Sequence, residues 1–315
     1  MTLSLFDTHC DTALELYRRQ EELQENTCHI SLSHVNAYEK YAQLFAVWSD
    51  RRLDDQTCWE DFFKVADNLD RLIGIKGKSI ARVRTQEELD AALAASKRAA
   101  VLAVEDARLL AGDIDRLQVL YDHGVRCMTL LWGGKTCIGG SHDTDSGLTD
   151  FGKLVTRRCF ELGIVPDISH ASEQSVDDII EIANQYNKPF IATHSNSYSA
   201  YAHTRNLRDR HLEVLMQLGG IVGVSMCTIH LRDCAQQNAG IDDVVHHIDR
   251  YMELGAQDHL CFGCDFDGTD LPDGIAHAGD LYKVADALAA HGYTTEQIEK
   301  IFWKNAYTFF QNQLK

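Results

Sequence analysis

Proline, long apolar runs and linkers are scarce in this sequence, and each absence excludes some classes of protein. Only 3 of the 315 residues are proline, the 21 glycines are dispersed, and there is no internal repeat or low-complexity tract. We therefore expect residues 1–315 to form a single domain, since some α/β folds reach this length as one unit. No segment approaches the ~20 apolar residues of a membrane span. Residues 1–11 lack the basic region and apolar run of a signal peptide, which predicts a cytoplasmic protein without a membrane partner.

Basic stretches are also absent. The chain has 47 acidic and 30 basic residues, a formal net charge of −17, so the phosphates of a nucleic acid would be repelled. Acidity agrees with simple solubility and leaves metal binding open, because carboxylates are ligands themselves. The 10 cysteines are scattered along the chain, and only Cys261 and Cys264 have CxxC spacing. We expect free thiols that mostly pack as small core residues.

Short apolar runs alternate with amphipathic stretches along the whole chain. The runs have the length and the Val, Ile and Leu content of strands buried on both faces. They cover residues 3–11, 41–49, 99–106, 125–132, 164–170, 190–195, 221–226 and 259–265. Helical patterns lie between them, at 173–185, 208–218 and 241–254, and Thr294 with Gln297 has capping-box spacing at the last helix.

Eight strands that alternate with helices predict a closed (β/α)8 TIM barrel of the metal-dependent hydrolase type. A doubly wound open sheet is the alternative, but it does not require eight strands. Chemistry in a barrel belongs at the carboxyl ends of the strands. Six residues that can bind metal or move a proton fall there: His9, Asp11, Glu105, His170, His194 and Asp265.

Each of these residues is a weak signal by itself. The H-x-D pair of His9 and Asp11 can aim both side chains at one ion, because alternate residues of a strand face the same way, yet a polar pair also closes many strands. A single histidine after a strand, such as His170 or His194, is more often structural than a ligand. Their occurrence together, in strand order, is far more specific. With a bridging Glu105 they supply three protein ligands to each of two metals and leave positions open for water.

The sequence resembles the renal (membrane) dipeptidase family, a branch of the amidohydrolase-type metal barrels. The resemblance rests on ordered motifs from one end of the chain to the other. They are DTHCD (7–11), AQLFAVW (42–48), VED (104–106), GVRCMTL (124–130), GLTDFG (147–152), DISH (167–170), THSNS (193–197), TRNLRD (204–209), GGIVGV (219–224) and CDFDG (264–268).

The resemblance implies the role of each candidate residue. His9 and Asp11 would hold one Zn²⁺, His170 and His194 a second, and Glu105 would bridge them. Asp265 would be the catalytic aspartate, passing a proton from the hydroxide that the ions share to the leaving amine. Arg205 would bind the terminal carboxylate of a dipeptide. These roles make the protein a zinc-dependent dipeptidase.

Two positions depart from the family pattern. Trp132 stands where the family has a loop histidine that stabilises the tetrahedral intermediate, and Met226 and Cys227 replace aromatic residues after the seventh strand. The following glycine-rich loop offers Lys135 and His142 as replacement donors. We expect Trp132 and His142 to contact substrate, although both His142 and Lys135 could equally be ordinary surface residues.

Three other functions remain open from the sequence. The same metal chemistry could act on another bond, as in a deaminase, a lactonase or an acylamino-acid hydrolase, although these relatives more often begin with H-x-H. A phosphoesterase is disfavoured because few cationic groups accompany the metals. A barrel without enzymatic activity is the third. As partners we expect a small dipeptide and no nucleic acid, and a homodimer remains open.

Overall fold

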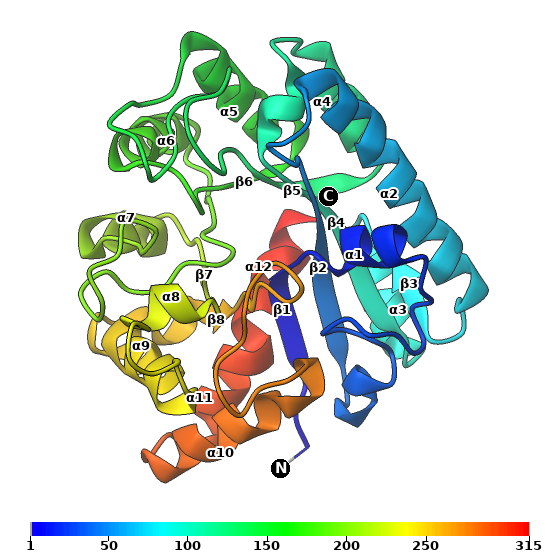
Figure 1. Ribbon diagram of the computed structural model, residues 1–315, viewed down its shortest axis with the longest axis vertical. Helices are drawn as coiled ribbons and strands as arrows, with labels where there is room; N and C mark the ends of the chain where they lie inside the picture. The colour runs from blue at the N-terminus through cyan, green and yellow to red at the C-terminus, as the bar shows by residue number, and fades with distance from the viewer. Residues whose placement is uncertain (1, 315) are drawn as a thin grey trace.

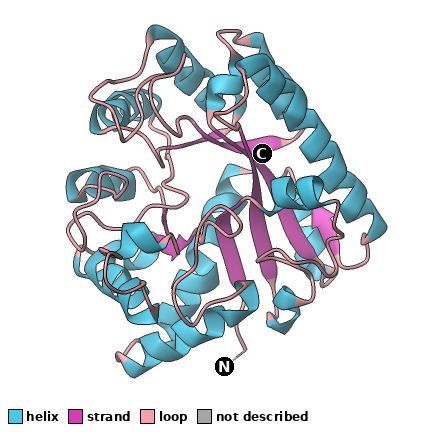
Figure 2. Ribbon diagram, viewed as in Figure 1, coloured by secondary structure: helices cyan, strands magenta, loops and turns pink. Residues whose placement is uncertain are grey.

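A curled sheet of parallel strands forms the centre of the molecule, with helices around its outside (Figures 1 and 2). The computed structural model describes residues 2–314. The strands are β1 (Leu5–Cys10), β2 (Tyr41–Trp48), β3 (Ile80–Arg82), β4 (Arg98–Glu105), β5 (Val125–Thr129), β6 (Val165–Asp167), β7 (Val222–Val224) and β8 (Leu260–Phe262). Their order in the sheet is β6-β5-β4-β2-β1-β8-β7, and the short β3 pairs with β4 outside this path.

Residues 190–193 occupy the remaining position of the barrel, the sixth in chain order. This segment forms single parallel bridges, Asp167 to Ile191 and Ala192 to Val222, and therefore lies between β6 and β7. Backbone hydrogen bonds run to both sides: the amide of Ile168 donates to Ile191 and the amide of Ala192 donates to Ile221. The barrel is thus closed, and all eight strands that the sequence predicted surround it, in chain order. The strand β3 was not predicted.

Helices follow the strands and cover their outer faces. They are α1 (Thr12–Arg19), α2 (Asp55–Ile75), α3 (Gln86–Ala94), α4 (Asp115–Asp122), α5 (Asp150–Leu162), α6 (Glu173–Tyr186), α7 (Asp209–Gln217), α8 (Thr228–Leu231), α9 (Ile241–Glu253), α10 (Tyr282–Ala290), α11 (Thr295–Glu299) and α12 (Asn305–Gln313). The predicted helices at 173–185, 208–218 and 241–254 correspond to α6, α7 and α9. The capping box of Thr294 and Gln297 is present at α11, because the Thr hydroxyl and the Gln amide each satisfy a backbone N–H that the helix leaves free.

The amino-terminal end of the barrel is closed by the end of the chain. A π-helical segment, η5 (Lys300–Lys304), joins α11 to α12, and the Phe310 ring stacks on Phe6 of β1 with centroids 5.1 Å apart. The opposite end, where the strands terminate, remains accessible. Eight of the ten cysteines are buried, as expected for core residues. Within residues 2–314, no helix has the length and apolar character needed to cross a membrane.

Candidate metal centre

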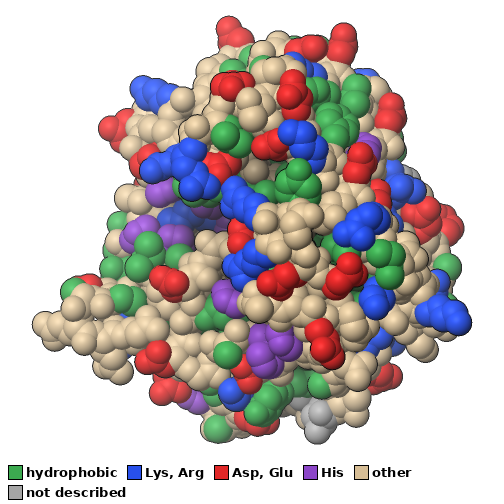
Figure 3. All heavy atoms as spheres, turned by 45° about the vertical axis from the view of Figure 1, so that its right-hand side comes forward, with side chains coloured by type: hydrophobic (Ala, Val, Ile, Leu, Met, Phe, Trp, Pro, Cys, Tyr) green, Lys and Arg blue, Asp and Glu red, His purple; other side chains and the backbone are tan. Residues whose placement is uncertain are grey.

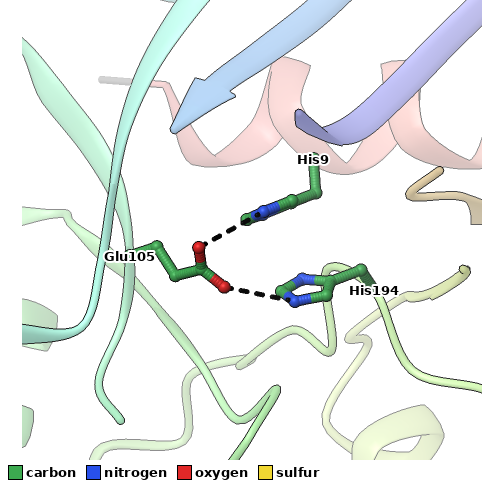
Figure 4. A group of neighbouring side chains, drawn as sticks. All are labelled: His9, Glu105 and His194. Atoms are coloured by element: carbon green, nitrogen blue, oxygen red, sulfur yellow. Dashed lines mark ion pairs between the residues drawn. The ribbon is translucent and has the colours of Figure 1, made fainter. Parts of the chain in front are cut away.

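Glu105 ends β4 in the middle of the site, and its two oxygens face different histidines (Figure 4). The Oε2 atom lies 3.7 Å from Nε2 of His9, and Oε1 lies 3.4 Å from Nε2 of His194 and 3.1 Å from Nε2 of His170. A carboxylate with one oxygen toward each of two ligand groups has the arrangement that bridges two cations. The side chain is almost completely buried, which raises the pKa of Glu105 well above its ordinary value.

The groups that surround Nε2 of His9 are carboxylates. Its Nε2 lies 3.7 Å from oxygens of Asp11, Glu105 and Asp265 and has no hydrogen-bond partner, although it is buried. Burial opposes charging of the imidazole, but Glu105, Asp11 and Asp265 overcome this and raise the pKa of His9 to about 10. The surroundings therefore demand a positive charge at this point. A metal ion supplies that charge, and it also gives the buried Nε2 a partner.

His194 is held in one tautomer by residues behind it. The Thr193 hydroxyl donates to Oδ2 of Asp167 at 2.5 Å, so its oxygen accepts from Nδ1 of His194 at 2.7 Å. Oδ1 of Asp167 accepts the backbone amides of Ser169 and Thr193, which ties β6 to the neighbouring segment. With its proton on Nδ1, the ring of His194 presents the Nε2 lone pair to the site. Such an outer partner is typical of a metal-binding histidine.

The same reasoning fixes His170. Its Nδ1 lies 3.1 Å from the backbone carbonyl of Trp132, which can only accept, so Nδ1 carries the proton. The two Nε2 atoms of His170 and His194 are 2.9 Å apart. Burial and the nearby Arg205 lower the pKa of His170, and burial, His9 and Arg205 lower that of His194. Two neutral nitrogens and Oε1 of Glu105 thus aim lone pairs at one point. A cation there removes their mutual repulsion, so these residues fit a second metal.

His170 and Asp265 have an unusual backbone conformation. Their φ angles are +69° and +63°, in the left-handed region that residues with a Cβ rarely adopt. Left-handed backbone costs roughly 1–2 kcal/mol per residue. Such conformations persist at functional sites, where the surrounding structure compensates for them. Here they turn each side chain into the barrel mouth directly after a strand.

A cavity of about 650 Å³ lies over these residues at the open end of the barrel. The structure places all nine residues predicted for the site in its walls or directly beneath them, including Arg205, Trp132 and His142. Lys135, the alternative donor, is exposed and does not line the cavity. Cys227 lines it, whereas Met226 is buried in the core.

The sequence did not single out four further residues of the cavity wall: Trp48, Arg51, His203 and His230. His203 and His230 pack with ring centroids 4.8 Å apart, and His203 precedes the TRNLRD motif by one residue. The position of His203 next to this motif was the only feature of the sequence that could have indicated it. Figure 3 shows histidine side chains together with Lys and Arg side chains around a recess of this face.

Arg205 is a buried cation without an acidic partner among residues 2–314. Its Nη1 donates to Oγ of Ser195 and its Nη2 to the carbonyl of His194, while Nε has no partner. The side chain is 4% exposed. Burial of a guanidinium without a carboxylate is costly. The arrangement is therefore suited to an anionic group that enters the cavity.

Fold and site together define a metal-dependent hydrolase on a TIM barrel. Comparison with known proteins agrees: the model of the membrane dipeptidase family, peptidase family M19, matches residues 1–313. The chain belongs to this family and is a metal-dependent dipeptidase.

Solved structures of the family superpose over the full chain. Dipeptidase AC, a metallopeptidase of family M19, is 26% identical, with a TM-score of 0.92 and coverage of 100% of this chain and 99% of the other. A metallopeptidase from Rhodobacter sphaeroides, bound to a phosphinate mimic of L-Ala-D-Ala, is 25% identical, with a TM-score of 0.92 and full coverage of both chains. The dipeptidase tcpJ of Claviceps purpurea is 27% identical over 252 residues, which is 78% of this chain and 58% of that protein.

Removal of metal is expected to destabilise the protein, because the lone pairs at the site then face one another. Treatment with a chelator should lower Tm by on the order of 10 °C, and added Zn²⁺ should restore it. Differential scanning calorimetry measures the change. His194→Ala should abolish this response, whereas His291→Ala, on an exposed residue outside the site, should keep it. An unchanged Tm in protein shown by elemental analysis to be metal-free would contradict the fit of these residues to a metal.

Proposed function

We propose that the protein is a zinc dipeptidase that binds two Zn²⁺ per chain. His9 and Asp11 would hold one ion, His170 and His194 the other, and Glu105 would bridge them. The observation that carries the proposal is the position of Glu105, whose two oxygens face different histidines. Zinc is the preferred metal because neutral imidazole and carboxylate are its usual ligands in catalytic sites with open positions.

When bound, the two zinc ions would activate a water molecule and polarise the scissile carbonyl. The protein's own residues would orient the substrate. Arg205 would bind the terminal carboxylate through the N–H groups that face the cavity, with two parallel hydrogen bonds. The carboxylates around Asp265 would attract the ammonium group at the other end. A site that binds both ends of its substrate selects dipeptides over longer peptides.

Asp265 would move the proton. Burial, opposed by His9, raises the pKa of Asp265 to about 7. A group with a pKa near the working pH can accept a proton from the attacking water and deliver it to the leaving amine. Its Oδ1 lies 3.7 Å from Nε2 of His9, so the carboxyl group is beside the proposed first metal.

Some expectations extend beyond the metal centre. We propose that residues 1–315 act as one catalytic domain, and that the protein works in the cytoplasm, with a homodimer still open. Action on another bond, as by an N-acyl amino-acid hydrolase or a lactonase, is the alternative function. It would use the same metals but would not require the two ends of a dipeptide to be bound.

The proposal is tested with metal-replete protein and a panel of L-L and L-D dipeptides. We expect about two zinc ions per chain by elemental analysis, and hydrolysis of dipeptides but not of tripeptides or N-acetylated dipeptides. One ion or none would disprove the bridged site. Turnover of lactones or N-acyl amino acids without turnover of dipeptides would favour the alternative function.

Asp265→Asn is expected to keep both metals and lose most turnover, since it removes a proton carrier with little change in shape. General acid–base catalysis contributes typically about 10² to 10⁴-fold, so kcat should fall within that range. Steady-state kinetics and zinc analysis on the same preparation measure both effects. Near-normal kcat would remove Asp265 from proton transfer, and loss of one zinc would make it a ligand instead.

We propose that His142 replaces the family's loop histidine as a donor to the carbonyl oxygen. Its ring lies 5.9 Å from that of His170 and its Nδ1 lies 3.2 Å from Oγ1 of Thr204, which leaves Nε2 for the cavity. Burial and Arg205 lower the pKa of His142 to about 4, so the ring is neutral at pH 7 and can donate one proton. Trp132, which stands at the family's position, lines the wall beside it.

His142→Ala is therefore expected to lower kcat/KM for the best dipeptide by about 10² to 10³-fold, the typical effect of losing one such donor. Zinc content should not change. The exposed Lys135→Ala is the matched control from the same loop and should remain close to wild type. A change of less than about threefold would make His142 a bystander and direct attention to His203 and His230, two further histidines of the cavity wall.

A further inference from the structure

The cavity has a second arginine without an acidic partner, Arg51. Three arginines line the cavity, and one of them, Arg18, is neutralised by Glu15 at 3.1 Å and Asp50 at 2.8 Å. Arg51 and Arg205 form no ion pair with any acidic residue in the described part of the chain. Arg51 is exposed at the cavity, whereas Arg205 is buried.

Arg51 is positioned by the aromatic wall of the cavity. Its guanidinium carbon lies 5.6 Å from the ring centroid of Trp132, a cation–π distance. Trp132 in turn packs against Trp48, with ring centroids 4.9 Å apart. Glu15, which also lines the cavity, pairs with Arg18 and Arg19, and Asp50, the residue before Arg51, pairs with Arg18 and Arg52. The hydrogen-bond donors of Arg51 therefore remain available to a ligand.

Arg51 and Arg205 come from opposite strands of the barrel. Arg51 follows β2, the second strand around the barrel, and Arg205 is bound to the end of the segment 190–193, the sixth. In a ring of eight strands the second and the sixth are diametrically opposed. A dipeptide whose terminal carboxylate lies on Arg205 and whose peptide bond lies at the metals extends its amino-terminal residue toward Arg51.

We propose that Arg51 is a specificity-determining residue that binds an acidic side chain on the amino-terminal residue of the dipeptide. The inference rests on the proposed function, and it names its substrate class as aspartyl and glutamyl dipeptides. The methylene groups of a glutamyl side chain would pack on Trp48 and Trp132, and its carboxylate would accept hydrogen bonds from Arg51. The ammonium group of the same residue would remain among the carboxylates near Asp265.

The test compares Glu-Ala with Gln-Ala, a neutral dipeptide of the same shape, on zinc-loaded enzyme. We expect kcat/KM to be about tenfold higher for Glu-Ala, mostly through KM, because Arg51 binds a remote part of the substrate. Arg51→Gln should remove this preference by lowering only the Glu-Ala value, and Arg51→Lys should restore part of it. Arg52→Gln, on the neighbouring arginine that does not line the cavity, is the matched control. At about 1 M NaCl, where the Debye length is about 3 Å, the preference should shrink.

Other outcomes separate this inference from the function on which it rests. Equal kcat/KM for Glu-Ala and Gln-Ala, within about twofold, would disprove the role of Arg51 and leave the dipeptidase intact. An equal loss on both dipeptides in Arg51→Gln would give Arg51 a general role in shaping the cavity and would also overturn the inference. If the zinc-loaded protein cleaves no dipeptide of any charge, the proposed function fails and the inference falls with it.

Discussion

The convergence of Glu105, His9, His170 and His194 is the constraint on which the rest of the site depends. Buried lone pairs that face one another are unfavourable unless a cation lies between them. The molecule maintains this arrangement because each residue ends a different strand of a closed barrel, and parallel strands bring their carboxyl ends to the same rim. A fold that places every ligand at a strand end therefore keeps the ligands at fixed distances even before a metal binds.

Hydrogen-bond acceptors behind the histidines complete this arrangement. Asp167 accepts the Thr193 hydroxyl, and that bond leaves the Thr193 oxygen free to accept from His194. The backbone carbonyl of Trp132 accepts from Nδ1 of His170 and so fixes the tautomer of that ring. Trp132 thus contributes its backbone to the metal centre and its ring to the substrate wall. A change of side chain at position 132 alters only the ring and keeps the carbonyl, so the metal centre can persist while substrate contacts diverge.

Much of this could be predicted from the sequence, and the failures have physical causes. The eight barrel strands were predicted because each is a continuous apolar run buried on both faces, and the candidate ligands were found because they end those runs. The strand β3 has three residues and no apolar run, so its pairing with β4 depends on tertiary contact. His203 and Arg51 come from loops and His230 from the short helix α8, where no periodicity relates sequence to direction. Of the adjacent Arg51 and Arg52, only the backbone path decides which one faces the cavity.

The charges of the cavity wall bear on substrate specificity. On the metal side, the carboxylates of Asp11, Glu105 and Asp265 require cations, so bound metal would offset their charge. Once they are offset, the positive charge of Arg51 and Arg205 remains in the cavity wall. A neutral dipeptide zwitterion offers one carboxylate for two guanidinium groups, whereas an acidic one offers two. The −17 net charge of the whole protein therefore says little about its substrate, because the two unpaired guanidinium groups of the cavity would meet the substrate carboxylates locally.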